Sequence, residues 1–217
     1  MKVSKGDFIE MDYIGKIKET SQIFDLTYED IAKKENIHNP NAHYHPIIIC
    51  IGENNIVKGL DSQLEGKETG EKYTIDVDIE NAFGKANPKL LQIIPLNVFT
   101  KEKINPIPGL QITMNDLIGT VRIVTGGRVM VDFNHPLAGK NLSYEIKINK
   151  VITDNNLKLK SIIEFHLHAH DVKAEIKEGR AVVELNTPDE IKEKLAEIVK
   201  RLIPAVKSIE FKTTSKE

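Results

Sequence analysis

The stretch of sequence that decides the fold is VDFNHPLAGK, residues 131–140. It closes a segment, residues 87–131, in which four prolines separate short runs typical of β-strands. Within that segment the pair Gly126-Gly127 lies between two such runs, 120–124 and 128–133, and this pattern predicts a hairpin. We therefore expect a small β module that ends at the quoted stretch.

The pattern of apolar and polar residues on both sides of this module predicts a sheet with a short helix. Residues 7–16 alternate apolar and polar side chains, which is typical of a half-buried strand, whereas residues 47–51 are apolar on both faces and predict a buried one. A turn at 52–55 leads into an amphipathic helix expected at 56–64 and ended by Gly66. The other elements expected around it are strands at 20–25, 71–79 and 142–151 and a short helix at 28–35.

Residues 153–217 predict a further part of the protein. Ile163, Phe165 and Leu167 alternate with histidines, which predicts a strand with one apolar face. We also expect a strand at 181–185, a helix from Pro188 to Leu202 capped by Thr187, and a last strand at 206–213. A β-rich α+β domain of about sixty residues is only marginally stable alone, and its strand edges offer a place to pair with a second copy.

Composition and charge exclude several classes of function. The formal net charge of the 217-residue chain is −2 with acids and bases intermixed, which gives no electrostatic reason to expect a nucleic-acid partner. Cys50, the single cysteine, lies in the apolar run 47–51, so a buried thiol is expected rather than a nucleophile. The amino terminus lacks the apolar core of a signal peptide, and no segment has membrane-spanning length, so we expect a cytoplasmic protein without a membrane partner.

Longer strings of sequence carry a resemblance to one family. The strings DYIG (12–15), IFD (23–25), IG (51–52), IVKGL (56–60), EGK (65–67) and AFG (82–84) occur in the order and spacing of FKBP-type prolyl isomerases. The stretch 131–140 is very similar to the signature that closes the inserted domain of SlyD-like members. Residues 153–217 resemble, more loosely, the extra carboxy-terminal domain of long archaeal members.

The resemblance implies an α+β fold in three parts. The first is an FKBP isomerase domain, residues 1–84 plus 133–152, whose antiparallel half-barrel sheet curls around the short helix at 56–64. The second is an insert-in-flap chaperone domain at 85–132, and the third is a carboxy-terminal α+β domain at 153–217. A homodimer through the third domain is one expectation.

The implied activity is peptidyl-prolyl cis/trans isomerisation, with unfolded chains that contain X–Pro bonds as partners. The reaction breaks no σ bond and needs no cofactor, because its barrier of roughly 18–20 kcal/mol comes from amide resonance. By resemblance, the catalytic residues are Tyr13, Asp25, Phe133 and Tyr144. The residues implied to bind substrate are Phe24, Ile47, Ile56, Val57, Leu60 and Phe83 in the pocket and Leu91, Ile94 and Leu96 in the insert.

Particular roles follow for some of these residues. The backbone N–H of Ile56 would bind a substrate carbonyl, and Asp25 would either accept a hydrogen bond from Tyr13 or polarise the region of the twisting carbonyl. Eukaryotic members carry larger or hydroxylated aromatic residues where Leu60, Phe83 and Ile47 stand, which argues against macrolide binding.

Competing interpretations stay open for several residues. Taken one at a time, aromatic side chains on alternating strands are more often core than pocket. The protein could instead be a holdase chaperone with weak isomerase activity. It could also handle metal, because His166, His168 and His170 would share one face of the strand expected there and imidazoles bind Ni²⁺, Cu²⁺ or Zn²⁺. That face could equally be an ordinary solvent or partner-contacting face.

Overall fold

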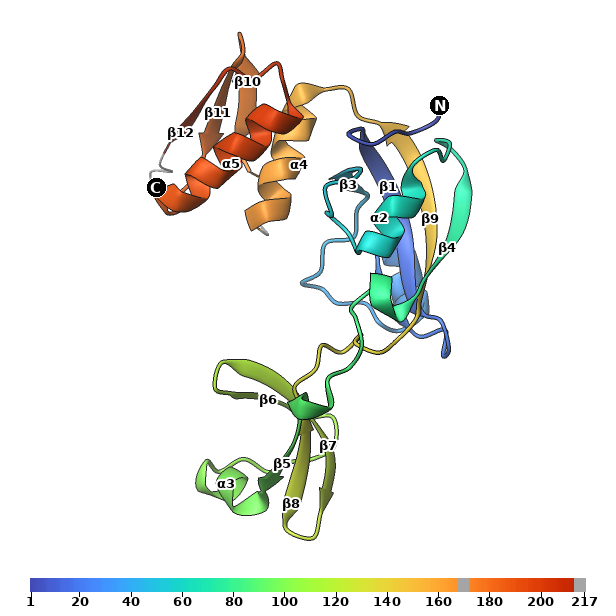
Figure 1. Cartoon of the computed structure of the whole chain (residues 1–217), viewed down its shortest axis with the longest axis vertical. Coiled ribbons are helices and arrows are strands. Elements are labelled where there is room, and N and C mark those ends of the chain that lie inside the picture. The colour runs from blue at the N-terminus through green and yellow to red at the C-terminus, as the bar shows by residue number, and fades with distance from the viewer. Residues whose placement is uncertain (168–171, 213–217) are drawn as a thin grey trace. The chain divides into compact units, whose positions relative to one another are not determined.

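The computed structural model describes residues 1–167 and 172–212, which form two compact units. The first unit consists of residues 1–77 together with the described residues from 142 onward, and the second consists of residues 78–141. The chain leaves the first unit at the end of one strand and returns to it at the start of another (Figure 1). The second unit extends beyond the insert expected at 85–132 on both sides.

One antiparallel sheet forms the centre of the first unit. Its order is β2-β1-β9-β4, and β3 also pairs with β1. These strands are β1 (Phe8–Ile17), β2 (Ile23–Leu26), β3 (Ile47–Cys50), β4 (Lys72–Val77) and β9 (Leu142–Val151). Strand β9 pairs along β1 from Ile9 to Ile17, whereas β3 and β2 pair with the two ends of β1. The mixed α+β fold with antiparallel sheets is thereby confirmed.

The buried Thr27 provides hydrogen-bond partners for the short stretch of β1 that pairs with neither β3 nor β2. The backbone N–H of Tyr13 donates to Thr27 Oγ1 at 3.0 Å, and the Thr27 hydroxyl donates to Asp12 Oδ1 at 2.8 Å. The Thr27 N–H donates to the carbonyl of Tyr13 at 3.0 Å. Because buried backbone groups need partners, this side chain completes the pairing of the strand and fixes the backbone of Tyr13.

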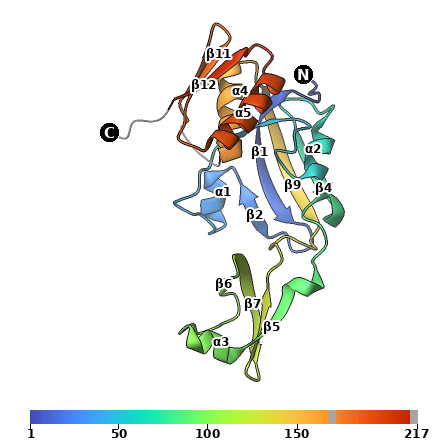
Figure 2. The same cartoon turned by 60° about the vertical axis from the view of Figure 1, so that its left-hand side comes forward.

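Two short helices pack against this sheet (Figure 2). Helix α2 (Lys58–Leu64) contacts β4 and buries Leu60 and Leu64. Helix α1 (Glu29–Lys34) packs Ala32 against Ile14 and Leu26. Side chains alternate along a strand, so Ile14 and α1 lie on the face of the sheet opposite to the one that carries Tyr13.

The second unit is a four-stranded antiparallel sheet in the order β5-β8-β7-β6. Its elements are β5 (Leu91–Pro95), α3 (Leu96–Lys101), β6 (Gln111–Met114), β7 (Leu117–Thr125) and β8 (Arg128–Asp132), with single 3₁₀ turns at Ile79–Asn81 and Pro88–Leu90. Gly126 and Gly127 have φ values of +54° and +72° between β7 and β8, which confirms the predicted hairpin. Residues 96–101 form helix α3, whose Phe99 is buried beside Ile94.

The carboxy-terminal residues form a three-stranded sheet with two helices. The elements are α4 (Asn155–Leu167), β10 (Ala174–Lys177), β11 (Arg180–Glu184), α5 (Asp189–Leu202) and β12 (Ser208–Lys212). The order is β10-β11-β12, and the pair β11–β12 is parallel. Their core is continuous with the first sheet, because one cluster of buried side chains joins Leu159, Leu195 and Val199 to Phe8 and Cys50. Cys50 is buried as expected, and burial raises the pKa of its thiol to about 12.

Two predictions in this region are wrong. The strand predicted from Ile163 onward is part of helix α4, which buries Leu159, Ile162 and Ile163 at helical spacing. The alternation that begins at Ile163 concealed this longer period. Helix α5 begins at Asp189 with Pro188 at its N-cap and no side-chain cap, so Thr187 does not cap it.

Among the described residues, no helix combines the length and the apolar composition that a membrane span requires.

The turn between β3 and α2 depends on a buried carboxylate. Asp61 of α2, 3 % exposed, accepts hydrogen bonds from the backbone N–H groups of Gly52 at 2.9 Å and Asn54 at 3.0 Å. We predict that Asp61→Ala lowers the free energy of unfolding in urea by about 2 kcal/mol, because two backbone donors lose their partner. The exposed neighbour Ser62 provides the matched control, and an equal loss in Ser62→Ala would contradict this role.

Candidate active site

A tyrosine and an aspartate form the polar part of the candidate site. The Tyr13 hydroxyl of β1 donates to Asp25 Oδ2 of β2 at 2.5 Å. The two residues come together because β1 and β2 are antiparallel, with Gly15 opposite Asp25. Of the two roles considered for Asp25, accepting a hydrogen bond from Tyr13 is the one that this geometry provides.

Aromatic rings surround this pair within the first unit. The ring of Tyr144 on β9 lies 5.8 Å from that of Phe24 at an interplanar angle of 89°, and 6.2 Å from that of Tyr13. Edge-to-face contacts of this kind are favourable because a positive ring edge meets a negative ring face. Four of the predicted site residues, from three strands, therefore form one cluster.

Gly15 makes room for this cluster. A Cβ atom at this position would lie 2.7 Å from Cζ of Phe24 and 3.1 Å from Cε1 of Tyr144. Any side chain at position 15 would therefore displace one of the two rings. The sequence reasoning gave Gly15 no role, although a glycine inside a strand is a signal for close approach.

The electrostatics of the cluster keep both phenols protonated. Burial, together with the neighbouring Asp25 carboxylate, raises the pKa of Tyr13 above its ordinary value. The same two causes raise the pKa of Tyr144. The site therefore offers neutral hydroxyl groups and one carboxylate, with aromatic surface around them.

The remaining predicted residues of the first unit lie around α2 and β3. Ile56 and Val57 are half-buried immediately before α2, and Leu60 is buried within it. Among the residues that the structure describes, none accepts a hydrogen bond from the Ile56 N–H, which leaves this donor open to a ligand. Ile47 is half-buried at the start of β3, opposite Met11.

Five predicted residues belong to the second unit. Phe133 is 8 % exposed in the core of that unit, where its ring lies against Gly119. Ile94 is buried in the same core and Leu96 packs against it, whereas Leu91 is 43 % exposed. Phe83 is 37 % exposed.

The ring of Phe83 stacks on a histidine that sequence reasoning did not single out. The Phe83 and His135 rings are 4.3 Å apart and inclined by only 5°. His135 Nδ1 accepts a hydrogen bond from the Leu137 N–H at 3.1 Å. His135 lies within the stretch 131–140, but its position in the sequence does not indicate a contact with Phe83.

His166, the described member of the histidines considered as metal ligands, lies on a helix and not on a strand. His166 lies in the last turn of α4, where its Nδ1 is 2.9 Å from the carbonyl oxygen of Ile162. His168 and His170 lie outside the described residues. Within residues 1–167 and 172–212, no group of three or more His, Cys, Asp or Glu side chains is arranged to hold a metal ion.

Comparison with known proteins identifies the family. Residues 1–100 match the model of the FKBP-type peptidyl-prolyl cis-trans isomerases, and residues 92–137 match that of the FKBP26 IF domain. A short-type peptidyl-prolyl cis-trans isomerase of Methanocaldococcus jannaschii is 32% identical over 149 residues, which cover 69% of this chain and 94% of the relative.

Two bacterial relatives extend the comparison. A probable FKBP-type 16 kDa peptidyl-prolyl cis-trans isomerase of Pseudomonas fluorescens is 37% identical over 48% of this chain and 71% of its own length. The FKBP-type isomerase SlyD of Vibrio cholerae is 31% identical over 59% of this chain and 63% of its own. The chain therefore belongs to the FKBP-type peptidyl-prolyl cis-trans isomerase family, and its reaction is the cis/trans isomerisation of X–Pro bonds.

Proposed function

We propose that the isomerase reaction takes place over the cluster of Tyr13, Phe24, Asp25 and Tyr144. The observation that carries the proposal is the grouping of three aromatic rings beside one carboxylate. The rings of Tyr13, Phe24 and Tyr144 lie close together, and the Tyr13 hydroxyl is bonded to Asp25 at 2.5 Å. The Ile56 N–H is a further polar group of the proposed site, because it has no acceptor within the described residues and can bind a substrate carbonyl.

An apolar site of this kind suits the chemistry of the reaction. Twisting the C–N bond removes the charge separation of the planar amide, so the twisted form loses less than the planar forms when it leaves water. Aromatic walls that bind proline and exclude water therefore favour the transition state over either ground state. No proton has to move, so Asp25 orients Tyr13 rather than acting as a base.

The hydroxyl of Tyr13 provides the first test. We predict that Tyr13→Ala lowers kcat/KM for an Ala-Leu-Pro-Phe peptide roughly tenfold or more, because it removes a wall of the pocket. Tyr13→Phe keeps the ring and loses the bond to Asp25, so a loss of about fivefold is expected. Tyr73→Phe on β4 is the matched control, since its hydroxyl accepts a bond from the Glu68 N–H. Activity unchanged in Tyr13→Ala would move the reaction away from this cluster.

We further propose that the second unit binds unfolded chains. One face of its sheet packs on its core, and the other face carries several exposed apolar side chains beside polar ones such as Thr120 and Asp132. Ile93 of β5 and Ile123 of β7 both lie opposite Met130 of β8, and they are 61% and 49% exposed. Leu91 and Ile118 extend this surface, with 43% and 65% of their area exposed. We call the set Leu91, Ile93, Ile118, Ile123 and Met130 the open face.

The open face suits clients of varied sequence. An apolar surface binds without directional demands, and the edge strands β5 and β6 offer main-chain groups for pairing with an extended segment. The client is then held on the same chain that carries the isomerase site. Because the two are linked, its X–Pro bonds meet that site at a high effective concentration. Of the insert residues implied by resemblance, Leu91 belongs to the open face, while Ile94 supports it from the core.

This division of labour gives the second test. We predict that Ile93→Ser combined with Ile123→Ser slows catalysed refolding of a proline-limited protein about tenfold or more, because the client is no longer held. Turnover of the short peptide should stay within twofold, and exposed positions cost little stability. Ile191→Ser on α5 is the control, since Ile191 is 38% exposed outside the open face. Equal loss on both substrates would refute the proposal, whereas a wild type that binds clients without isomerising them would favour the holdase.

We also propose that the protein forms a homodimer through β12. The outer face of the carboxy-terminal sheet carries charged pairs such as Arg180 with Glu210, which suits solvent rather than a partner. At the β10 edge, the Ile176 N–H already donates to Asn156 Oδ1. The β12 edge is therefore the better place for strand pairing with a second copy.

Light scattering tests the dimer. At tens of micromolar protein we expect twice the chain mass of 24.5 kDa, because the β12 edge has no partner strand among the described residues and such an edge favours pairing. A mass of 24.5 kDa across that concentration range would overturn the proposal.

A further inference from the structure

We propose that the carboxy-terminal region is a positioning element of the isomerase: Arg201 of α5, through Glu53, fixes the segment 50–56 that presents the Ile56 N–H to substrate. This inference rests on the proposed role of that N–H. It gives residues of α5 a part in the reaction although they do not touch the substrate.

Most of the segment 50–56 is already held by bonds within the isomerase sheet and α2. The Cys50 N–H donates to Asn55 Oδ1 at 2.9 Å, and Asp61 accepts from Gly52 and Asn54. Gly52 and Asn54 have φ values of +86° and +54°, so the segment turns sharply. Such a turn presents a backbone donor accurately only while its ends and its tip are all fixed.

The tip of the turn is Glu53, and it is held from outside the isomerase sheet. Its carboxylate accepts two hydrogen bonds from the Arg201 guanidinium, at 2.6 and 2.7 Å. A bidentate pair of this type restricts orientation as well as distance. Hydrogen bonding to Arg201 holds the pKa of the Glu53 carboxyl below its ordinary value, so the pair stays charged at neutral pH.

Buried side chains of helix α5 hold Arg201 in a fixed position. Leu195 and Val199, six and two residues before Arg201, are 1% and 0% exposed. They belong to the cluster that also contains Phe8 and Cys50, so α5 and the start of the segment share one core. A movement of α5 relative to the turn would disrupt that core, and interiors packed in this way resist such movement.

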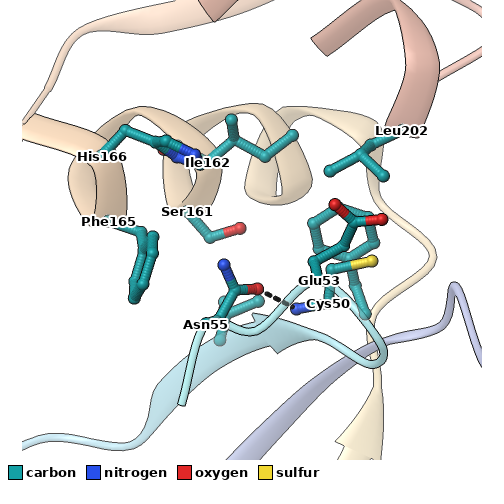
Figure 3. A pocket seen from close by; sticks show the side chains of 10 residues that line it. Cys50, Glu53, Asn55, Ser161, Ile162, Phe165, His166 and Leu202 are labelled. Atoms are coloured by element: carbon teal, nitrogen blue, oxygen red, sulfur yellow. Dashed lines mark hydrogen bonds between the residues drawn. The ribbon is translucent and has the colours of Figure 1, made fainter. Parts of the chain in front are cut away.

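Helix α4 also lies against the segment. Cys50, Glu53 and Asn55 line a small pocket together with Ser161, Ile162 and Phe165 of α4 (Figure 3). The Asn55 amide points toward Ser161 in this view, while its oxygen holds the Cys50 N–H. The segment thus lies against both α4 and α5, and Ile56 is its last residue.

The experiment compares five variants of the full-length chain with the Ala-Leu-Pro-Phe peptide. Arg201→Gln and Glu53→Gln each remove the ion pair, and their double variant completes a cycle. Arg180→Gln is the matched control, because it breaks a 2.7 Å ion pair with Glu210 in the same region but away from the turn. For each variant, kcat/KM, the urea midpoint and the backbone amide resonance of Ile56 are measured.

We expect kcat/KM to fall about fivefold in Arg201→Gln and in Glu53→Gln, and no further in the double variant, since all three lose the same contact. The Ile56 amide resonance should shift or broaden in these variants and stay in place in Arg180→Gln. Arg201→Lys keeps the charge without the bidentate geometry and should recover part of the activity.

Two outcomes would overturn the inference. The first is full activity and an unmoved Ile56 amide in folded Arg201→Gln. The second is an equal loss in Arg180→Gln, which would point to stability alone. A wild type that does not accelerate isomerisation of the peptide would overturn the proposed site as well. Failure of the proposed site can therefore be told apart from failure of this inference alone.

Discussion

The antiparallel pairing of β1 with β9 is the interaction on which the rest of the structure depends. It joins Ile17 to Leu142, so the sheet cannot close until the chain has crossed the whole second unit. The second unit lowers the cost of that closure by bringing its own ends together. Near its two ends, the Ile79 N–H donates to Asn141 Oδ1 at 3.2 Å and the Gly139 N–H to the Gly84 carbonyl at 2.8 Å. A folded insert replaces what would otherwise be a long, entropically costly loop.

The same pairing sets the chemistry of the site. Its register places Gly15 opposite Tyr144, which allows the Phe24 and Tyr144 rings to meet over the glycine. A slip of one residue would turn Tyr144 to the other face of the sheet and separate it from Tyr13. Thr27 protects the register from the opposite edge of β1, because it supplies partners where neither β2 nor β3 reaches. The polar part of the site thus follows from strand pairing.

The carboxy-terminal region is joined to the isomerase sheet by its core. Phe8 and Cys50 of the sheet are buried in one cluster with Leu159 of α4 and Leu195 of α5. A region of this size would have little core of its own, and sharing one supplies the missing apolar burial. The shared core also gives Arg201 a fixed position from which to reach Glu53. Stability and the geometry of the turn therefore have the same structural basis.

By itself, the sequence determined the strands β1 and β9, the hairpin at Gly126-Gly127 and the family, because periodicity, turn chemistry and motif spacing are local properties. It also identified Tyr13, Phe24, Asp25 and Tyr144, through strings whose spacing carries the resemblance. Only the tertiary structure decided that residues 155–167 form a helix, since a short alternation there competes with a longer helical period. It alone placed Phe133 in the core of the second unit and joined Glu53 to Arg201. Contacts between residues far apart in the chain depend on how the faces pack, and local pattern does not encode that choice.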